Sequence, residues 1–70
     1  MMPLLLAPVG ESNMVRHIGG TPEVRRHLED LGFVAGATVT IISRIGGNVI
    51  VKVKESRLAI DEKMAQKIMV

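Results

Sequence analysis

Four residues in the first half of the chain have the types and spacing of a metal site. His27 lies in a predicted helix, with Glu23 four residues before it and Asp30 three residues after it. His17 lies in a short predicted strand upstream. Side chains three or four residues apart share one helix face, and imidazole nitrogens and carboxylate oxygens are ligands for zinc and ferrous iron. These four residues are therefore a candidate Zn²⁺ or Fe²⁺ site, the alternative being a solvent-exposed helix face with an unrelated strand histidine.

No arrangement of residues in this chain indicates an enzyme. The serines Ser12, Ser43 and Ser56 have no neighbouring sequence that would activate a nucleophile. The pair Gly19-Gly20 is followed by no phosphate-loop pattern and is interpreted as a turn. The chain has no cysteine, which removes disulfides and thiolate metal sites and fits a reducing cytosol. We therefore expect a non-enzymatic, cytoplasmic protein.

A second group of residues suits contact with another macromolecule. Four cations fall on segments predicted to be neighbouring strands, with two isoleucines between them. A surface that mixes basic and apolar side chains is suited to docking on a protein or on an anionic membrane face. The alternative is ordinary strand alternation, in which lysines protect a sheet edge from aggregation. The candidate docking residues are Ile42, Arg44, Ile50, Lys52, Lys54 and Arg57.

The charge distribution does not predict nucleic-acid binding. The formal net charge is only +2, although the pI is about 9.5, and no basic run is longer than Arg25-Arg26. Proteins that bind nucleic acid usually concentrate positive charge on one face. Phe33 is the only aromatic residue, so the chain has no platform for base stacking.

The segments that carry these residues are predicted to be short strands with two helical interruptions. Thr21-Pro22-Glu23 has the preferences of a helix start, and Gly32 is expected to end that helix in a left-handed conformation. Period-two alternation is clearest from 48 to 54, and Gly46-Gly47 predicts a tight turn before it. Predicted strands span 14–18, 38–44, 48–54, 57–60 and 68–70, with a single helical turn at 62–67.

These elements predict a mainly β fold with short helices, organised as one domain over residues 1–70. Five short strands at close spacing favour a small, partly open β-barrel with one helix inserted after the first strand. Leu4, Leu5 and Leu6 are expected to pack in its core. A domain of 70 residues gains stability from oligomerisation or a partner, so a homo-oligomer is one expectation. No signal peptide is indicated, and no segment approaches the roughly 20 apolar residues of a membrane span.

Six short motifs follow one another along the chain. They are Val15-x-x-Ile18-Gly19-Gly20, Arg26-His27-Leu28-x-x-Leu31-Gly32, Phe33-x-x-Gly36-x-x-Val39, Gly46-Gly47-Asn48, Leu58-Ala59-Ile60 and Met64-Ala65-x-x-Ile68-x-Val70. Their order and spacing over residues 4–70 resemble the FeoA family, the small cytoplasmic accessory proteins of bacterial ferrous-iron transport. One departure is Ala35, where many members of that family have proline; alanine loosens the turn slightly and puts no functional residue in doubt.

The resemblance implies an SH3-like barrel that docks on the cytosolic, GTP-hydrolysing part of a FeoB-type ferrous-iron transporter. It implies a cytoplasmic location, with attachment to the inner membrane through that partner. An arginine supplied to the transporter's nucleotide is one way to act on it, the candidates being Arg16, Arg25, Arg26, Arg44 and Arg57. The same domain also occurs at the C-terminus of iron- and manganese-dependent repressors of the diphtheria-toxin-repressor type. The alternative function is therefore an Fe²⁺ or Zn²⁺ sensor or carrier. The sequence shows no winged helix, which argues against a repressor.

Overall fold

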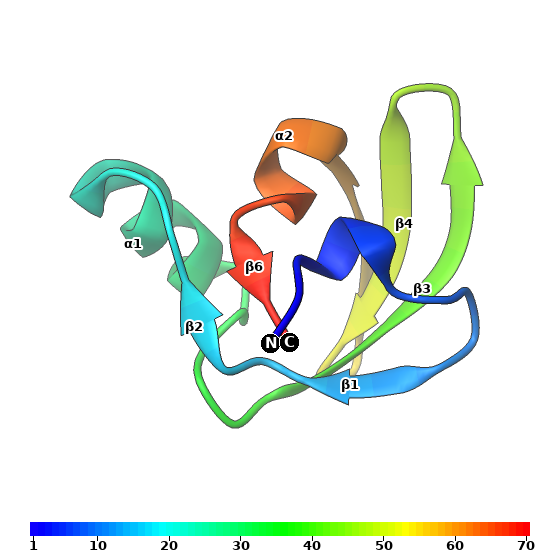
Figure 1. Ribbon diagram of the computed structural model, residues 1–70, viewed down its shortest axis with the longest axis horizontal. Helices are drawn as coiled ribbons and strands as arrows, with labels where there is room; N and C mark the ends of the chain where they lie inside the picture. The colour runs from blue at the N-terminus through cyan, green and yellow to red at the C-terminus, as the bar shows by residue number, and fades with distance from the viewer.

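The computed structural model describes all 70 residues, which form two antiparallel sheets (Figure 1). The larger sheet has the strand order β1-β3-β4-β5, and the smaller sheet pairs β2 with β6. In chain order the elements are η1 (Leu4–Leu6), β1 (Ser12–Met14), β2 (His17–Ile18), α1 (Pro22–Asp30), β3 (Thr38–Ile45), β4 (Asn48–Val53), β5 (Ser56–Asp61), α2 (Glu62–Ala65) and β6 (Ile68–Met69).

The β3–β4 hairpin at the centre of the larger sheet follows from its alternating sequence. Val49, Val51 and Val53 of β4 are buried on the inner face, whereas Lys52 is exposed on the outer face. Gly46 has φ +60 in the two-residue turn, a left-handed conformation that a Cβ disfavours. The predicted hairpin is confirmed, and β4 ends at Val53 rather than one residue later.

The predicted strand over 14–18 is wrong as a single element, because the chain changes partner in its middle. Its first part pairs with β3 and its last part with β6. Between them, the Val15 N–H donates to the Ala37 carbonyl oxygen at 2.8 Å, and the Arg16 N–H donates to the Met69 carbonyl oxygen at 2.8 Å. This segment therefore joins the two sheets, and α1 follows the second strand rather than the first.

The two ends of the chain lie side by side at the centre of the molecule (Figure 1). The Met2 N–H donates to the Val70 carbonyl oxygen at 2.9 Å, and the Val70 N–H donates to the Met2 carbonyl oxygen at 2.8 Å. Of the three leucines expected in the core, Leu4 is fully buried, Leu5 is half-buried and Leu6 is 68% exposed. Only one of the three leucines fully meets the expectation, because the tight turns of η1 point successive side chains in different directions.

Both helices begin with the side-chain caps that their sequences predict. The Thr21 hydroxyl of α1 accepts from the Val24 N–H at 3.3 Å, and the Asp61 carboxylate of α2 accepts from the Met64 N–H at 2.7 Å. Gly32 follows α1 with φ +110, as expected for a helix end. The helix α2 is shorter than predicted and ends at residue 65.

One apolar core of 15 side chains holds the two sheets and the helices together, and no polar side chain is buried in it. Phe33 is its largest member and is fully buried, as is Leu28 of α1. The mainly β fold with short helices is therefore confirmed, with six strands in two open sheets instead of five. None of its helices has the length and apolarity to span a bilayer.

Candidate functional site

The outer face of the larger sheet carries polar and basic side chains in register across all four strands. Ser12 of β1 lies opposite Thr40 of β3, Thr40 lies opposite Lys52 of β4, and Lys52 lies opposite Arg57 of β5. Successive strand residues point to opposite faces, so the buried valines of β4 fix which side chains face outward. The row is therefore a consequence of the apolar alternation in the hairpin.

A hollow of about 450 Å³ lies over β1, β3 and β4 on this outer face. Only one of its lining side chains is apolar, and the others carry hydroxyl or ammonium groups. We call this hollow the basic groove, and its lining residues are Ser12, Ala37, Thr38, Thr40, Lys52 and Lys54.

The groups that line the basic groove are suited to binding an anion. The hydroxyls of Ser12 and Thr40 lie 3.2 Å apart and share a hydrogen bond. Neither Lys52 nor Lys54 takes part in any side-chain hydrogen bond of the protein, so their ammonium donors are free. No carboxylate lines the groove. Carboxylate or phosphate oxygens are the acceptors that such a donor set fits.

The predicted docking residues divide between this face and the rest of the molecule. Lys52 and Lys54 line the groove, and Arg57 extends it onto β5. Ile50 is half-buried opposite Ala59 on the same face. The register of the hairpin shifts at Ile42, which is half-buried in the resulting bulge. Whether these residues contact a partner stays a prediction.

Arg44 has a contact that the sequence did not predict. Beyond the bulge it lies opposite Val49, and its guanidinium reaches the N-terminal segment. It donates to the carbonyl oxygens of Leu5 at 2.8 Å and Ala7 at 2.6 Å. The short, two-pronged contact is typical of the guanidinium fork. Of the five candidate arginine fingers, this is the only one held by a hydrogen bond within the protein.

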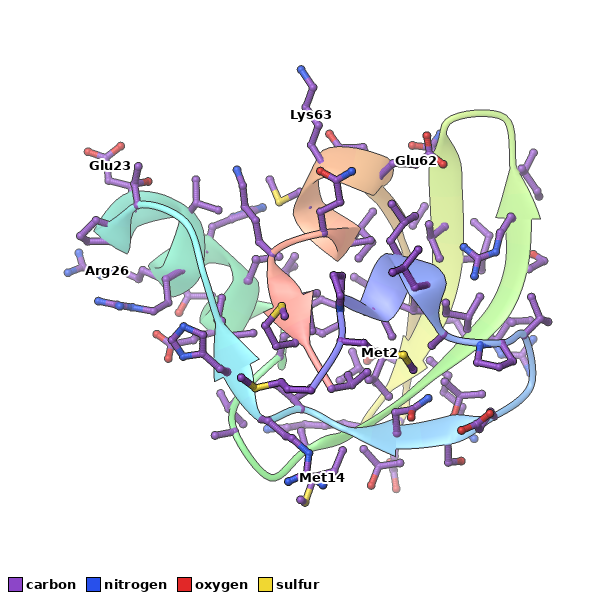
Figure 2. All side chains as sticks on the ribbon, in the orientation of Figure 1. Met2, Met14, Glu23, Arg26, Glu62 and Lys63 are labelled. Carbon is purple, nitrogen blue, oxygen red and sulfur yellow. The ribbon has the colours of Figure 1, made fainter.

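The four predicted metal ligands are exposed and do not converge. His17 lies on β2, whereas Glu23, His27 and Asp30 lie on α1. Figure 2 shows Glu23 at the outer end of α1, pointing away from the body of the protein. No group of three or more histidine, cysteine, aspartate or glutamate side chains in the structure is arranged to hold a metal ion. A stable zinc site uses at least three protein ligands, so direct metal binding stays a prediction without a formed site.

Four groove residues were not among the predicted site residues, namely the apolar Ala37 and the hydroxyl residues Ser12, Thr38 and Thr40. Thr38 and Thr40 alternate with the buried Val39, so the period of β3 contained the signal that places them on the outer face. Ser12 had no local signal, because its position depends on the pairing of β1 with a strand far along the chain. Hydroxyl residues are common on strands, so these three indicate a binding site only because two lysines lie beside them.

The fold and the outer groove define a class: small, mainly β domains with a single apolar core and a polar outer face. Comparison with protein-family models matches the FeoA domain over residues 2–70. The chain belongs to the FeoA family, which confirms the resemblance carried by its motifs. Comparison with curated proteins gives no match.

Solved structures of FeoA proteins share this fold. The crystal structure of an iron uptake regulatory protein, FeoA, is 28% identical, with 96% of this chain and 89% of that chain covered and a TM-score of 0.87. FeoA from Chlorobium tepidum is 28% identical, and the match covers 97% of this chain and 67% of that chain with a TM-score of 0.88. FeoA from Stenotrophomonas maltophilia, crystallised with zinc, is 25% identical, with 99% and 88% covered and a TM-score of 0.86. It is described as a prokaryotic SH3 domain protein and as a candidate activating factor of bacterial ferrous-iron transport.

A manganese-dependent transcriptional repressor also contains this fold. The match is 19% identical, covers 94% of this chain but 38% of the repressor, and has a TM-score of 0.84. At this identity the likeness concerns the fold alone. It agrees with the expectation that the same domain occurs within metal-dependent repressors.

Proposed function

We propose that this protein is a non-enzymatic accessory factor of bacterial ferrous-iron uptake that docks on the cytosolic, GTPase-containing part of a FeoB-type transporter. The observation that carries the proposal is the FeoA family match over residues 2–70. The description of the Stenotrophomonas maltophilia relative as a candidate activating factor supports it. The protein then works in the cytoplasm as an SH3-like module and reaches the inner membrane through its partner.

The physical basis for docking is a rigid sheet with one face free. The inner face of β3 and β4 is filled by fully buried valines and Ile41, so the strands are held in place by the core. The outer face presents Lys52, Lys54 and Arg57 on this fixed frame. The backbone of the sheet then needs no rearrangement on binding, which lowers the entropic cost of association. Positive charge on this face also favours the approach of an acidic surface.

Titration of the isotope-labelled protein with the cytosolic region of a FeoB-type transporter, followed by amide NMR, tests this proposal. We expect localised shifts over the outer face of the larger sheet. The variant Lys52→Ala is expected to weaken binding about tenfold, the value of one charge-assisted hydrogen bond. The matched control is Lys63→Ala, because Lys63 projects into solvent from α2 (Figure 2). Absence of shifts with both the nucleotide-free and the GTP-analogue-bound transporter region would contradict docking on this region.

The same complex tests whether an arginine acts on the bound nucleotide. Arg44 is held by its hydrogen bonds to the N-terminal segment, so the candidates without such a contact are Arg16, Arg25, Arg26 and Arg57. If one of them is a finger, its alanine variant lowers stimulated GTP hydrolysis by roughly 10³-fold while leaving docking intact. Equal hydrolysis rates for all four variants would remove this role and leave docking alone.

A metal sensor or carrier is the second candidate function. The observation that favours it is the zinc bound in the crystals of the Stenotrophomonas maltophilia relative. An anaerobic titration with Fe²⁺ or Zn²⁺ tests it, with His17, Glu23, His27 and Asp30 as the expected ligands. Binding at about micromolar affinity that is lost in His27→Ala supports this function. Unchanged amide signals at these four residues contradict it.

A further inference from the structure

The cations in and beside the basic groove come from neighbouring backbone positions around the turn between β4 and β5. Lys52 lies in β4, and Lys54 follows in the turn between β4 and β5. Arg57 lies opposite Lys52 on the neighbouring strand, about 5 Å away. Each of these three cations can bind its own carboxylate, so a ligand with several carboxylates gains more charge-assisted hydrogen bonds than a single anion does. An acidic peptide segment carries such a series of carboxylates, and in extended form the side chains on one of its faces lie about 7 Å apart.

We infer that the basic groove binds an extended acidic segment of a protein partner, whose carboxylates contact Lys54, Lys52 and Arg57. This inference rests on the proposed docking function and names the chemistry of the docked segment. The groove has the matching character, because hydroxyl donors and free ammonium groups line it and no carboxylate does. Glu11 and Glu55 are next in sequence to Ser12 and Lys54 but do not line the groove.

The backbone around the groove argues against a phosphate as the ligand. Phosphate sites generally use several backbone N–H groups that point toward the anion. Here β3 and β4 are both central strands of the larger sheet, so their amides are used in the ladders with β1, β5 and each other. Stacking of nucleic-acid bases has no aromatic partner, because Phe33 is fully buried in the core.

The conformation of Lys54 is a second, independent indication. It has φ +55 and is the only non-glycine residue of the chain with positive φ. Glycine or asparagine would adopt this conformation with less strain. The lysine therefore gives the groove a cation at a position where folding alone favours another residue. Such strained residues are often found at binding sites.

Amide NMR with a synthetic hexaglutamate peptide as the probe tests this inference on the full-length protein. We expect shifts at Ser12, Thr38, Thr40, Lys52 and Lys54, and their loss at about 1 M salt, where charges are screened within roughly 3 Å. The double variant Lys52→Gln/Lys54→Asn should raise the Kd at least about tenfold, because it removes two charged donors. Glutamine keeps a polar, unbranched side chain at an exposed strand position, and asparagine tolerates the left-handed backbone, so the fold is preserved.

The control variant removes the same charge elsewhere. Arg26→Gln/Lys63→Gln changes two exposed cations that point away from α1 and α2 (Figure 2). It should leave the Kd within about twofold, as expected for screened charges distant from the site. An equal loss in both double variants would overturn the inference, because attraction would then depend on net charge alone. Equal shifts with inorganic phosphate would also overturn it, in favour of a small-anion site.

A parallel titration with the transporter's cytosolic region separates this inference from the proposed function. Shifts outside the groove, unaffected by Lys52→Gln/Lys54→Asn, would leave docking standing and overturn the acidic-segment inference. Groove shifts with hexaglutamate but none with the transporter region would support the groove and contradict the proposed partner. Groove shifts with both, lost in the same variant, support the two together.

Discussion

The β3–β4 hairpin and the N-terminal segment contribute to one core but are specified by different information. The hairpin is built from residues close in sequence, and its buried valines alternate with outward-facing side chains. The N-terminal segment is held by groups far along the chain: Met2 pairs with Val70, and Arg44 binds the carbonyl oxygens of Leu5 and Ala7. The alternation of residues therefore predicts the structure of the hairpin, whereas the contacts of the N-terminal segment become known only from the folded structure.

Removing the buried leucine of the N-terminal segment is the most severe test of this comparison. Leu4 is fully buried in the shared core, so Leu4→Ala should lower the free energy of unfolding by about 2–5 kcal/mol. Leu6 is 68% exposed and gives the matched control, with an expected change within about 0.5 kcal/mol for Leu6→Ala. Denaturant unfolding of the two variants measures both values. Equally small losses would mean that the N-terminal segment is an appendage and not part of the core.

Loss of the Arg44 contact should have an intermediate effect. Arg44→Ala removes two charge-assisted hydrogen bonds at the surface, and we expect a loss of about 1–2 kcal/mol. Arg57→Ala removes a strand arginine with no hydrogen bond inside the protein, so its expected loss is below about 0.5 kcal/mol.

Hydrogen exchange locates the effect of the Arg44 change. The Ala7 amide, which donates to the Leu4 carbonyl oxygen, should exchange faster in Arg44→Ala. The Val51 amide lies in the central β4 and should keep its protection relative to global unfolding. Faster exchange throughout the hairpin would show that the two regions cannot open separately.

These contacts also mark the limit of what the sequence could predict about the fold. The caps at Thr21 and Asp61, the helix end at Gly32 and the hairpin turn all follow from local preferences, and the structure has each of them. The break of the first strand depends on the position of β6, at the far end of the chain. Alternation cannot show that a strand changes partner, because the backbone stays extended on both sides of the change.

The hairpin turn provides a smaller and fully local test. Gly46 has φ +60, and an added Cβ there would meet no atom within 4 Å, so Gly46→Ala is opposed only by backbone strain. We expect a loss of about 1 kcal/mol. Gly47 is equally open but does not have positive φ, so Gly47→Ala should change stability by less than about 0.5 kcal/mol. Thermal unfolding resolves the difference, since about 1 kcal/mol shifts the Tm of a domain this size by roughly 4–8 °C. Equal shifts in Tm for Gly46→Ala and Gly47→Ala would mean that a side chain at Gly46 adds no backbone strain.

The candidate site was predictable to the extent that it lies on the hairpin. Lys52 faces outward because its neighbours in β4 are buried, and this follows from period two. The bulge at Ile42 reverses the faces beyond it, so Arg44 points to the N-terminal segment although simple alternation places it with Ile50 on the outer face. Bulges have weak sequence signals because one extra residue fits many sequences.

The smallest expected effect concerns Lys54, where one substitution tests both stability and binding. Lys54 has φ +55, so Lys54→Gly should relieve strain and raise the free energy of unfolding by about 0.5 kcal/mol, after the entropic cost of glycine. Glu55→Gly is the neighbouring control: Glu55 does not have positive φ, and the change should destabilise by about 0.5–1 kcal/mol. A chemical-unfolding series at matched conditions measures both signs.

The same Lys54→Gly variant should bind hexaglutamate several-fold more weakly, because it loses one ammonium donor of the basic groove. Higher stability with weaker binding would show that this turn carries its lysine for recognition and not for folding. Lower stability would contradict that conclusion. It would indicate that the Lys54 aliphatic chain, which lies beside Gly32, stabilises the end of α1 by packing. The conformation of Lys54 would then be set by its contact with Gly32, which is distant in sequence, and not by the local backbone preference. In this respect the turn after β4 would resemble the N-terminal segment.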